Sequence, residues 1–221
     1  MTSNETESAN NHASGTTVWD PVVRFGHWAL VVAFAIAYFS AEEEAGGPDV
    51  LHVWGGYAVG AIIILRVLWG FIGSKYARFS DFVGEVVSAP RYLVDLVRGR
   101  ARRYLGHSPA GGAMIIALLV SLAATVATGV IAYGERGKGP LAVNGAGIVK
   151  QAAAEEDEDV RAVPKAGAKG EESVMGELHD SLANITLALI ILHVLGVGLA
   201  SFVHRENLLI AMITGRKRAE D

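Results

Sequence analysis

Apolar residues along the chain gather into four blocks that polar connections separate. Each block approaches the roughly 20 residues that a helix needs to cross the ~30 Å hydrocarbon core of a bilayer. Asp20 and Pro21 precede the first block in the order of an N-cap and a first helical residue. The pattern predicts an all-α protein, an integral membrane four-helix bundle with up-down-up-down topology. We expect its helices at about 20–40, 50–72, 111–133 and 178–204.

The connections between the blocks differ in charge, and this difference predicts how the bundle is oriented. The connection 74–109 is basic and its apolar residues recur at helical spacing, which is typical of amphipathic segments on a membrane surface. Basic connections stay in the cytoplasm. The tail 206–221 also carries a basic cluster, and the polar residues 1–17 are predicted to be a disordered tail. Both termini are therefore expected to be cytoplasmic, and the acidic connection 134–176 periplasmic.

Composition limits the cofactor chemistry. The sequence has seven histidines and no cysteine. Thiolate-held iron–sulfur clusters, disulfides and covalently attached c-type haem are therefore excluded. Any metal cofactor must be held non-covalently, and histidine is the strongest candidate ligand. The net charge of −4 gives no basis for a nucleic-acid partner.

Four of the histidines within the predicted helices lie at two depths. His179 and His193 are fourteen positions apart, which places them on one helix face about 21 Å apart along the axis. Because the helices alternate in direction, His52 and His179 lie at the outer ends of the second and fourth helices. His27 and His193 lie in the inner half of the bundle. Two depth-matched pairs are predicted, His52 with His179 and His27 with His193.

A pair of imidazoles from facing helices is the arrangement in which a helix bundle holds a six-coordinate haem. Such a haem has no open coordination position, so it passes electrons rather than binding oxygen. The alternative is that these are core histidines hydrogen-bonded to neighbouring helices. Two pairs at matching depths arise by chance less often than one pair. We therefore favour histidines that bind haem over histidines that only form hydrogen bonds in the core. The prediction is a four-helix dihaem membrane domain over residues 18–205.

Two arginines share the depth of the inner pair. Arg24 lies one turn before His27, and Arg66 follows His52 by fourteen positions on nearly the same face. Each is a candidate partner for the propionates of an inner haem. For Arg24 the alternative is a side chain that extends to the lipid headgroups.

The remaining three histidines are not expected to bind a cofactor. His12 belongs to the polar N-terminal stretch, and His107 ends the basic connection, where we expect it to be solvated. His204 follows His193 by eleven positions on nearly the same face. It is an alternative to His193 as a ligand, but it lies at the water boundary, and we favour His193.

Several motifs stand out along the chain: VWD (18–20), RFGHW (24–28), HVWGG (52–56), RVLWGFIG (66–73), GHSPAGG (106–112) and the helix from Leu178-His179 to Leu192-His193. Together they resemble the bacterial cytochrome b561 family, which includes the b-type cytochrome subunits of nickel–iron hydrogenases. The resemblance covers about residues 19–205 apart from the loop 134–176, which is longer and more acidic than is usual in the family.

The resemblance implies a multi-pass protein of the bacterial inner membrane with two non-covalent haem b groups. By position, the family's axial ligands correspond to His27, His52, His179 and His193. The implied function is electron transfer between a periplasmic electron carrier or enzyme subunit and the quinone pool of a respiratory chain. The acidic loop is then either solvated or a docking surface for a basic electron carrier.

Two other functions are compatible with the resemblance. One is a superoxide oxidase that passes electrons from superoxide to quinone, which would make the protein a quinone oxidoreductase. The other belongs to a different class, a non-catalytic membrane anchor subunit for a hydrogenase or a dehydrogenase. The sequence names no catalytic acid, base or nucleophile, because electron transfer between haems needs none.

Overall fold

A computed structural model describes residues 16–41, 43–44, 47–142 and 173–218. Within these ranges all the long elements are helices, as the sequence predicts, and the four strands have two residues each. The elements in chain order are β1 (Thr16–Thr17), α2 (Pro21–Phe39), β2 (Glu43–Glu44), β3 (Gly47–Pro48), α3 (Val50–Ile72), the 3₁₀ turns η1 (Lys75–Ala77), η2 (Phe79–Asp81) and η3 (Val83–Ser88), α4 (Ala89–Val97), α5 (Pro109–Glu135), α7 (Val174–His204), α8 (Leu208–Thr214) and β4 (Arg216–Lys217).

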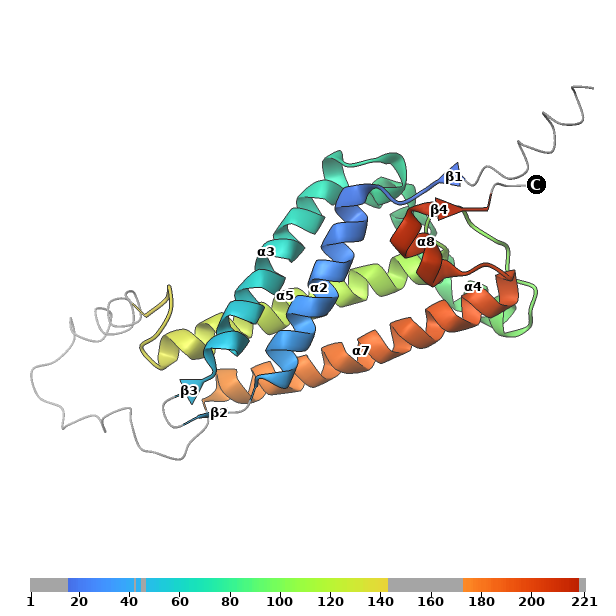
Figure 1. The fold of residues 1–221 in the computed structure, drawn as a ribbon. Helices are drawn as coiled ribbons and strands as arrows, with labels where there is room; N and C mark the ends of the chain where they lie inside the picture. The colour runs from blue at the N-terminus through green and yellow to red at the C-terminus, as the bar shows by residue number, and fades with distance from the viewer. Residues whose placement is uncertain (1–15, 42, 45–46, 143–172, 219–221) are drawn as a thin grey trace, which may run out of the picture.

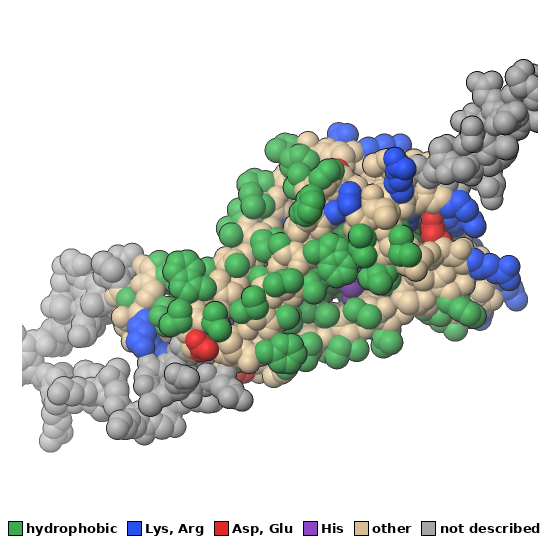
Figure 2. All heavy atoms as spheres, in the orientation of Figure 1, with side chains coloured by type: hydrophobic (Ala, Val, Ile, Leu, Met, Phe, Trp, Pro, Cys, Tyr) green, Lys and Arg blue, Asp and Glu red, His purple; other side chains and the backbone are tan. Residues whose placement is uncertain are grey.

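The four long helices α2, α3, α5 and α7 are each long and apolar enough to cross a membrane. Many of their large apolar side chains point outward: Phe25 is 73% exposed and Val120 is 64% exposed. Figure 2 shows these side chains spread over the long helices, while most Lys and Arg side chains on this face gather toward the end that carries α8 and β4. This distribution is typical of a bundle whose outer surface contacts lipid.

The last long helix begins earlier than the sequence pattern predicts. Ser173 is its N-cap and its Oγ accepts a hydrogen bond of 3.1 Å from the backbone nitrogen of Gly176. The cap therefore starts α7 at Val174, four residues before the predicted 178. The acidic segment 143–172 lies outside the described residues, as do His12 and most of the predicted tail.

The long helices pack in two neighbouring pairs, α2 along α3 and α5 along α7 (Figure 1). A small apolar core joins α2, α3 and α5 through Ala33, Val59, Ile63 and Leu122. Two glycines allow close contact between helices. A Cβ added at Gly55 would lie 3.0 Å from Ala37, and one added at Gly129 would lie 2.8 Å from His179.

One end of the bundle is closed by the connection 74–109 and by the C-terminal segment. β1 pairs antiparallel with β4, with Thr16 opposite Lys217, so the first and last described residues lie at the same end (Figure 1). In α4 the side chains of Tyr92 and Leu96 are buried against the bundle while Val97 is 75% exposed. α4 therefore has one face buried against the bundle, and the location of this connection on a membrane surface stays a prediction.

Asp20 ties α2 to α3 at this end. Its carboxylate accepts hydrogen bonds from the backbone nitrogen of Val23 at 3.0 Å, from Trp69 Nε1 at 3.1 Å and from Ser74 Oγ at 2.5 Å. Burial raises the pKa of Asp20, but the hydrogen bonds from Ser74, Val23 and Trp69 outweigh it, so the pKa lies below its ordinary value. The ionised carboxylate is thus the form that this junction stabilises.

Candidate functional site

The structure brings the four predicted histidines together in two pairs. His52 of α3 and His179 of α7 have ring centres 5.8 Å apart with planes at 88°. His27 of α2 and His193 of α7 have ring centres 6.5 Å apart with planes at 52°. We call the first the outer pair and the second the inner pair, after the predicted orientation. α7 supplies one member of each.

Both rings of the outer pair are fixed by backbone carbonyl groups of neighbouring helices. Nδ1 of His52 lies 2.8 Å from the carbonyl oxygen of Ala37, and Nδ1 of His179 lies 2.9 Å from that of Thr125. A carbonyl oxygen only accepts hydrogen bonds, so Nδ1 must carry the proton in each ring. Nε2 is left with its lone pair, which is the arrangement usual for histidines that bind a metal.

The inner pair is less constrained by hydrogen bonds. Nδ1 of His27 is buried and has no hydrogen-bond partner among the residues that the structure describes. The His27 ring packs edge-on against Trp28, with ring centres 5.3 Å apart. A buried imidazole nitrogen without a partner is costly, so His27 needs a ligand or a solvent molecule that satisfies it.

Both predicted arginines reach backbone carbonyl groups near the closed end of the bundle. Arg66 donates from Nη1 to the carbonyl oxygen of Ala77 at 3.3 Å, and its guanidinium lies 5.4 Å from the ring centre of Phe79. Arg24 donates to the carbonyl oxygen of Ile213 in α8. Its Nε is buried without a partner among the described residues, so Arg24 keeps a donor for another group.

His204 lies apart from both pairs. Its Nε2 is 3.2 Å from the hydroxyl group of Tyr92 in α4. The ring therefore holds α4 against the end of α7, while His193 is the residue that faces His27. The geometry favours His193 over its alternative.

The prediction that His107 is solvated is wrong. Its ring packs between Trp19, with ring centres 4.6 Å apart, and Phe82, at 4.7 Å. Burial, together with the nearby charges of Arg66 and Lys217, lowers the pKa of His107 to about 3. His107 is thus a neutral residue of the packed end, because the basic connection folds back over the start of α2.

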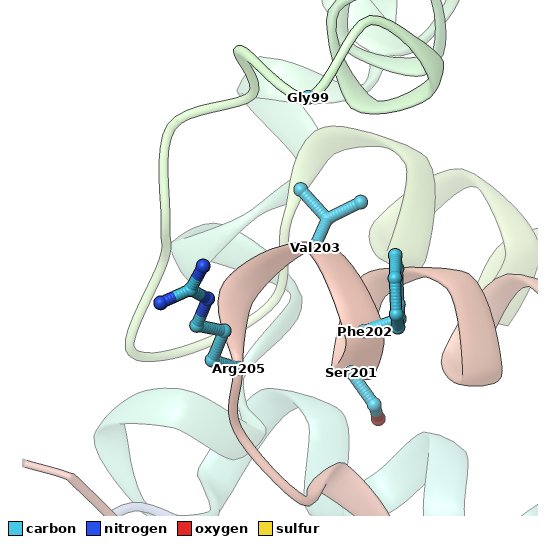
Figure 3. Close-up of a pocket in the computed structure, with 5 residues that line it drawn as sticks. All are labelled: Gly99, Ser201, Phe202, Val203 and Arg205. Atoms are coloured by element: carbon cyan, nitrogen blue, oxygen red, sulfur yellow. The ribbon is translucent and has the colours of Figure 1, made fainter.

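A depression of about 580 Å³ lies at the C-terminal end of α7, away from both histidine pairs. Figure 3 shows Val203 and Arg205 of the α7 terminus beneath the turn at Gly99. Ser201 and Phe202 complete its lining. None of the paired histidines contributes to it, so we assign it no part in the site.

The sequence did not indicate that α5 takes part in the site. Its Thr125 carbonyl binds His179, and its Gly129 leaves room for that ring. Hydroxyl groups of the same two helices meet nearby: Thr186 Oγ1 lies 2.6 Å from Ser121 Oγ and 3.1 Å from Thr125 Oγ1. Ser121 and Thr125 lie one turn apart, which was a weak signal that this face of α5 contacts another helix.

Comparison with known proteins identifies one family over most of the chain. The family model described as prokaryotic cytochrome b561 matches residues 18–215. Searches of curated proteins and of solved structures gave no match. The matched range contains all four long helices and both imidazole pairs. The chain therefore belongs to the prokaryotic cytochrome b561 family, and it is a multi-pass membrane b-type cytochrome of electron transfer.

Proposed function

We propose that the protein is a dihaem cytochrome of the inner membrane that transfers electrons between a periplasmic redox partner and the quinone pool. The observation that carries the proposal is that four imidazole rings form two pairs, at two levels of one bundle. Each pair joins α7 to a different helix, α3 for the outer pair and α2 for the inner pair. A chain of this family needs ligands for haem b, and these four rings are its candidates.

The ring separations fit two axial ligands on one metal ion. Ring centres on opposite sides of an iron ion should be about 6 Å apart, because each metal–nitrogen bond is about 2 Å and each ring centre lies roughly 1 Å further. The observed separations are 5.8 Å for the outer pair and 6.5 Å for the inner pair. These values support His52, His179, His27 and His193 as the four ligands.

When bound, haem supplies a one-electron couple between ferric and ferrous iron. The residues of the chain hold it and exclude other chemistry. The two imidazoles of each pair would hold the haem iron between them, and oxygen would then find no free ligand position. The outer rings are already in the tautomer that offers Nε2, because the Ala37 and Thr125 carbonyl groups take the Nδ1 protons.

Charge supports the proposed orientation. The connection 74–109, α8 and β4 gather at the end of the bundle where both described chain ends lie. This end carries most of the Lys and Arg side chains visible in Figure 2. Since basic connections stay in the cytoplasm, this end would be cytoplasmic, and the inner pair with Arg24 would lie nearer to it.

The first experiment is a haem count with a redox titration of the purified protein. The pyridine haemochrome assay should give two haem b groups per chain, and a quinol analogue should reduce them. A protein purified without Soret absorbance would contradict the proposal and favour the non-catalytic anchor. Rapid reduction of the haems by superoxide, followed by reoxidation by quinone, would instead identify superoxide as the donor.

We predict that the Arg66→Leu variant has a lower reduction potential at the inner haem. The guanidinium lies on α3 at the closed end of the bundle, and removing a nearby cation makes the reduced form less favourable. A potentiometric titration of both haems measures the effect, with the exposed Arg98→Leu as the matched control. An unchanged or raised potential would count against a contact between Arg66 and a propionate.

A further inference from the structure

We propose that Gly129 and Gly55 are positioning residues for the outer imidazole pair. Each glycine lets a histidine ring reach a backbone carbonyl of the adjacent helix, and this contact fixes which ring nitrogen is offered to the metal. The inference rests on the proposed dihaem function. It assigns a role to two residues that bind no cofactor atom themselves, and it makes the outer pair chemically different from the inner pair.

Gly129 of α5 lies directly against the ring of His179. A Cβ at this position would lie 2.8 Å from Cε1 and 2.9 Å from Nδ1 of His179, well inside the 3.5–4.0 Å at which carbon atoms normally pack. The carbonyl that accepts the Nδ1 proton belongs to Thr125, one turn earlier on the same helix. A side chain at position 129 would therefore occupy the space from which His179 reaches that carbonyl.

Hydrogen bonds between side chains fix the alignment of α5 with α7 about two turns from His179. Thr186, seven residues after His179 in α7, is fully buried and lies 2.6 Å from Ser121 Oγ and 3.1 Å from Thr125 Oγ1. These hydroxyl contacts fix how far α7 can slide along α5. The ring of His179 cannot avoid a larger residue at position 129 by a shift of the whole helix, so the ring itself must move.

Gly55 of α3 has the corresponding role for His52. It lies one turn after His52, and a Cβ there would be 3.0 Å from both Cβ and N of Ala37. Ala37 is the residue whose carbonyl oxygen lies 2.8 Å from Nδ1 of His52. α2 ends two residues later, at Phe39, and the last carbonyl groups of a helix lack partners within it. Close contact at Gly55 thus brings an unpaired carbonyl to His52.

The chemical consequence follows from the hydrogen bond at Nδ1. A carbonyl that accepts the Nδ1 proton makes Nε2 a stronger donor to a metal. A stronger donor favours ferric over ferrous iron and so lowers the reduction potential. Among the described residues, Nδ1 of His27 has no such acceptor. The glycines therefore lower the potential of the outer haem specifically.

The test compares Gly129→Ala with Gly198→Ala in the purified full-length protein. Gly198 lies on α7 and no described atom comes within 4 Å of its Cβ position, so this control changes helix propensity without touching a ring. The measurements are the haem content, the low-spin EPR signals and the potential of each haem. A His179→Ala variant identifies the EPR component of the outer haem, since that component should disappear.

We expect Gly129→Ala to raise the potential and change the EPR signal of the outer haem alone, and to weaken its binding about 10- to 100-fold. Gly198→Ala should match the wild type. If Gly129→Ala cannot be purified, Gly55→Ala tests the same role through His52. The positioning role alone would be overturned if the wild type binds two haems and the Gly129→Ala or Gly55→Ala variant has unchanged haem potentials. A wild-type protein without haem would overturn both proposals.

Discussion

In the His193→Ala variant, haem content should fall from two per chain to about one. His193 faces only one of the two other spans that carry paired histidines: its ring centre is 6.5 Å from that of His27. The outer pair lies elsewhere on α7 and keeps both of its carbonyl contacts. Under the proposed assignment, removal of one of the two imidazoles would leave the inner haem with a single protein ligand, and this haem should be lost during purification.

The same reasoning predicts which substitutions behave alike. His27→Ala should match His193→Ala, whereas His52→Ala and His179→Ala should each remove the outer haem and keep the inner one. The pyridine haemochrome assay gives the count, and a redox titration shows which component is missing. Variants of one pair should lack the same component.

His204→Ala is the matched control for this series. It removes an imidazole from the same helix, but that ring contacts the hydroxyl group of Tyr92. Both haems should therefore remain. If His193→Ala retained both haems at full occupancy while His204→Ala lost one, the assignment of the inner ligand would pass to His204.

The second large effect is expected at the junction of α2 and α3. Asp20→Ala removes the acceptor for three hydrogen bonds, from Val23, Trp69 and Ser74. Loss of an N-cap and of hydrogen bonds to a charged group should destabilise the protein by about 2–3 kcal/mol in total. The apparent unfolding temperature in detergent should fall accordingly.

Asp49→Ala is the control for Asp20→Ala. Asp49 is also an N-cap, but its side chain accepts a single hydrogen bond of 3.0 Å, from the backbone nitrogen of Leu51. Its loss should cost about 1 kcal/mol. Equal effects of the two substitutions would show that Asp20 is a helix cap and no more.

The stability that this junction provides should decrease at acidic pH. The pKa of Asp20 lies below its ordinary value because the hydrogen bonds from Ser74, Val23 and Trp69 outweigh the effect of burial. A lowered pKa means that the stabilisation is complete above the ordinary pKa near 3.8 and is lost as the pH falls through the folded value. The Asp20→Ala variant should lack this part of the acid sensitivity.

Periodicity was sufficient to predict the helices and the approach of the paired histidines. A spacing of fourteen residues places His179 and His193 on one face of any α-helix, and alternation of helix direction gives the depth of His52 and His27. These inferences need only the geometry of a single helix and the alternation of successive membrane spans. The structure accordingly places the ring centres 5.8 Å apart in the outer pair and 6.5 Å apart in the inner pair.

Contacts that depend on how two helices are aligned could not be predicted in this way. The approach of Gly129 to His179 joins residues from α5 and α7, and nothing in either segment fixes their relative shift. His107 was misjudged for a similar reason: Trp19, which covers its ring, is distant in the sequence. Polar neighbours in the sequence predict that a side chain is exposed only where the segment does not fold back onto the rest of the protein.

The pairing of β1 with β4 makes the protein suitable for circular permutation. Residues 16 and 217 are strand partners, so a short linker could join the two ends without spanning the bundle. New ends could then be opened between α5 and α7, whose facing termini lie at the opposite end (Figure 1). Such a circular permutant would keep all four spans and both ring pairs while placing its termini on the other side of the membrane.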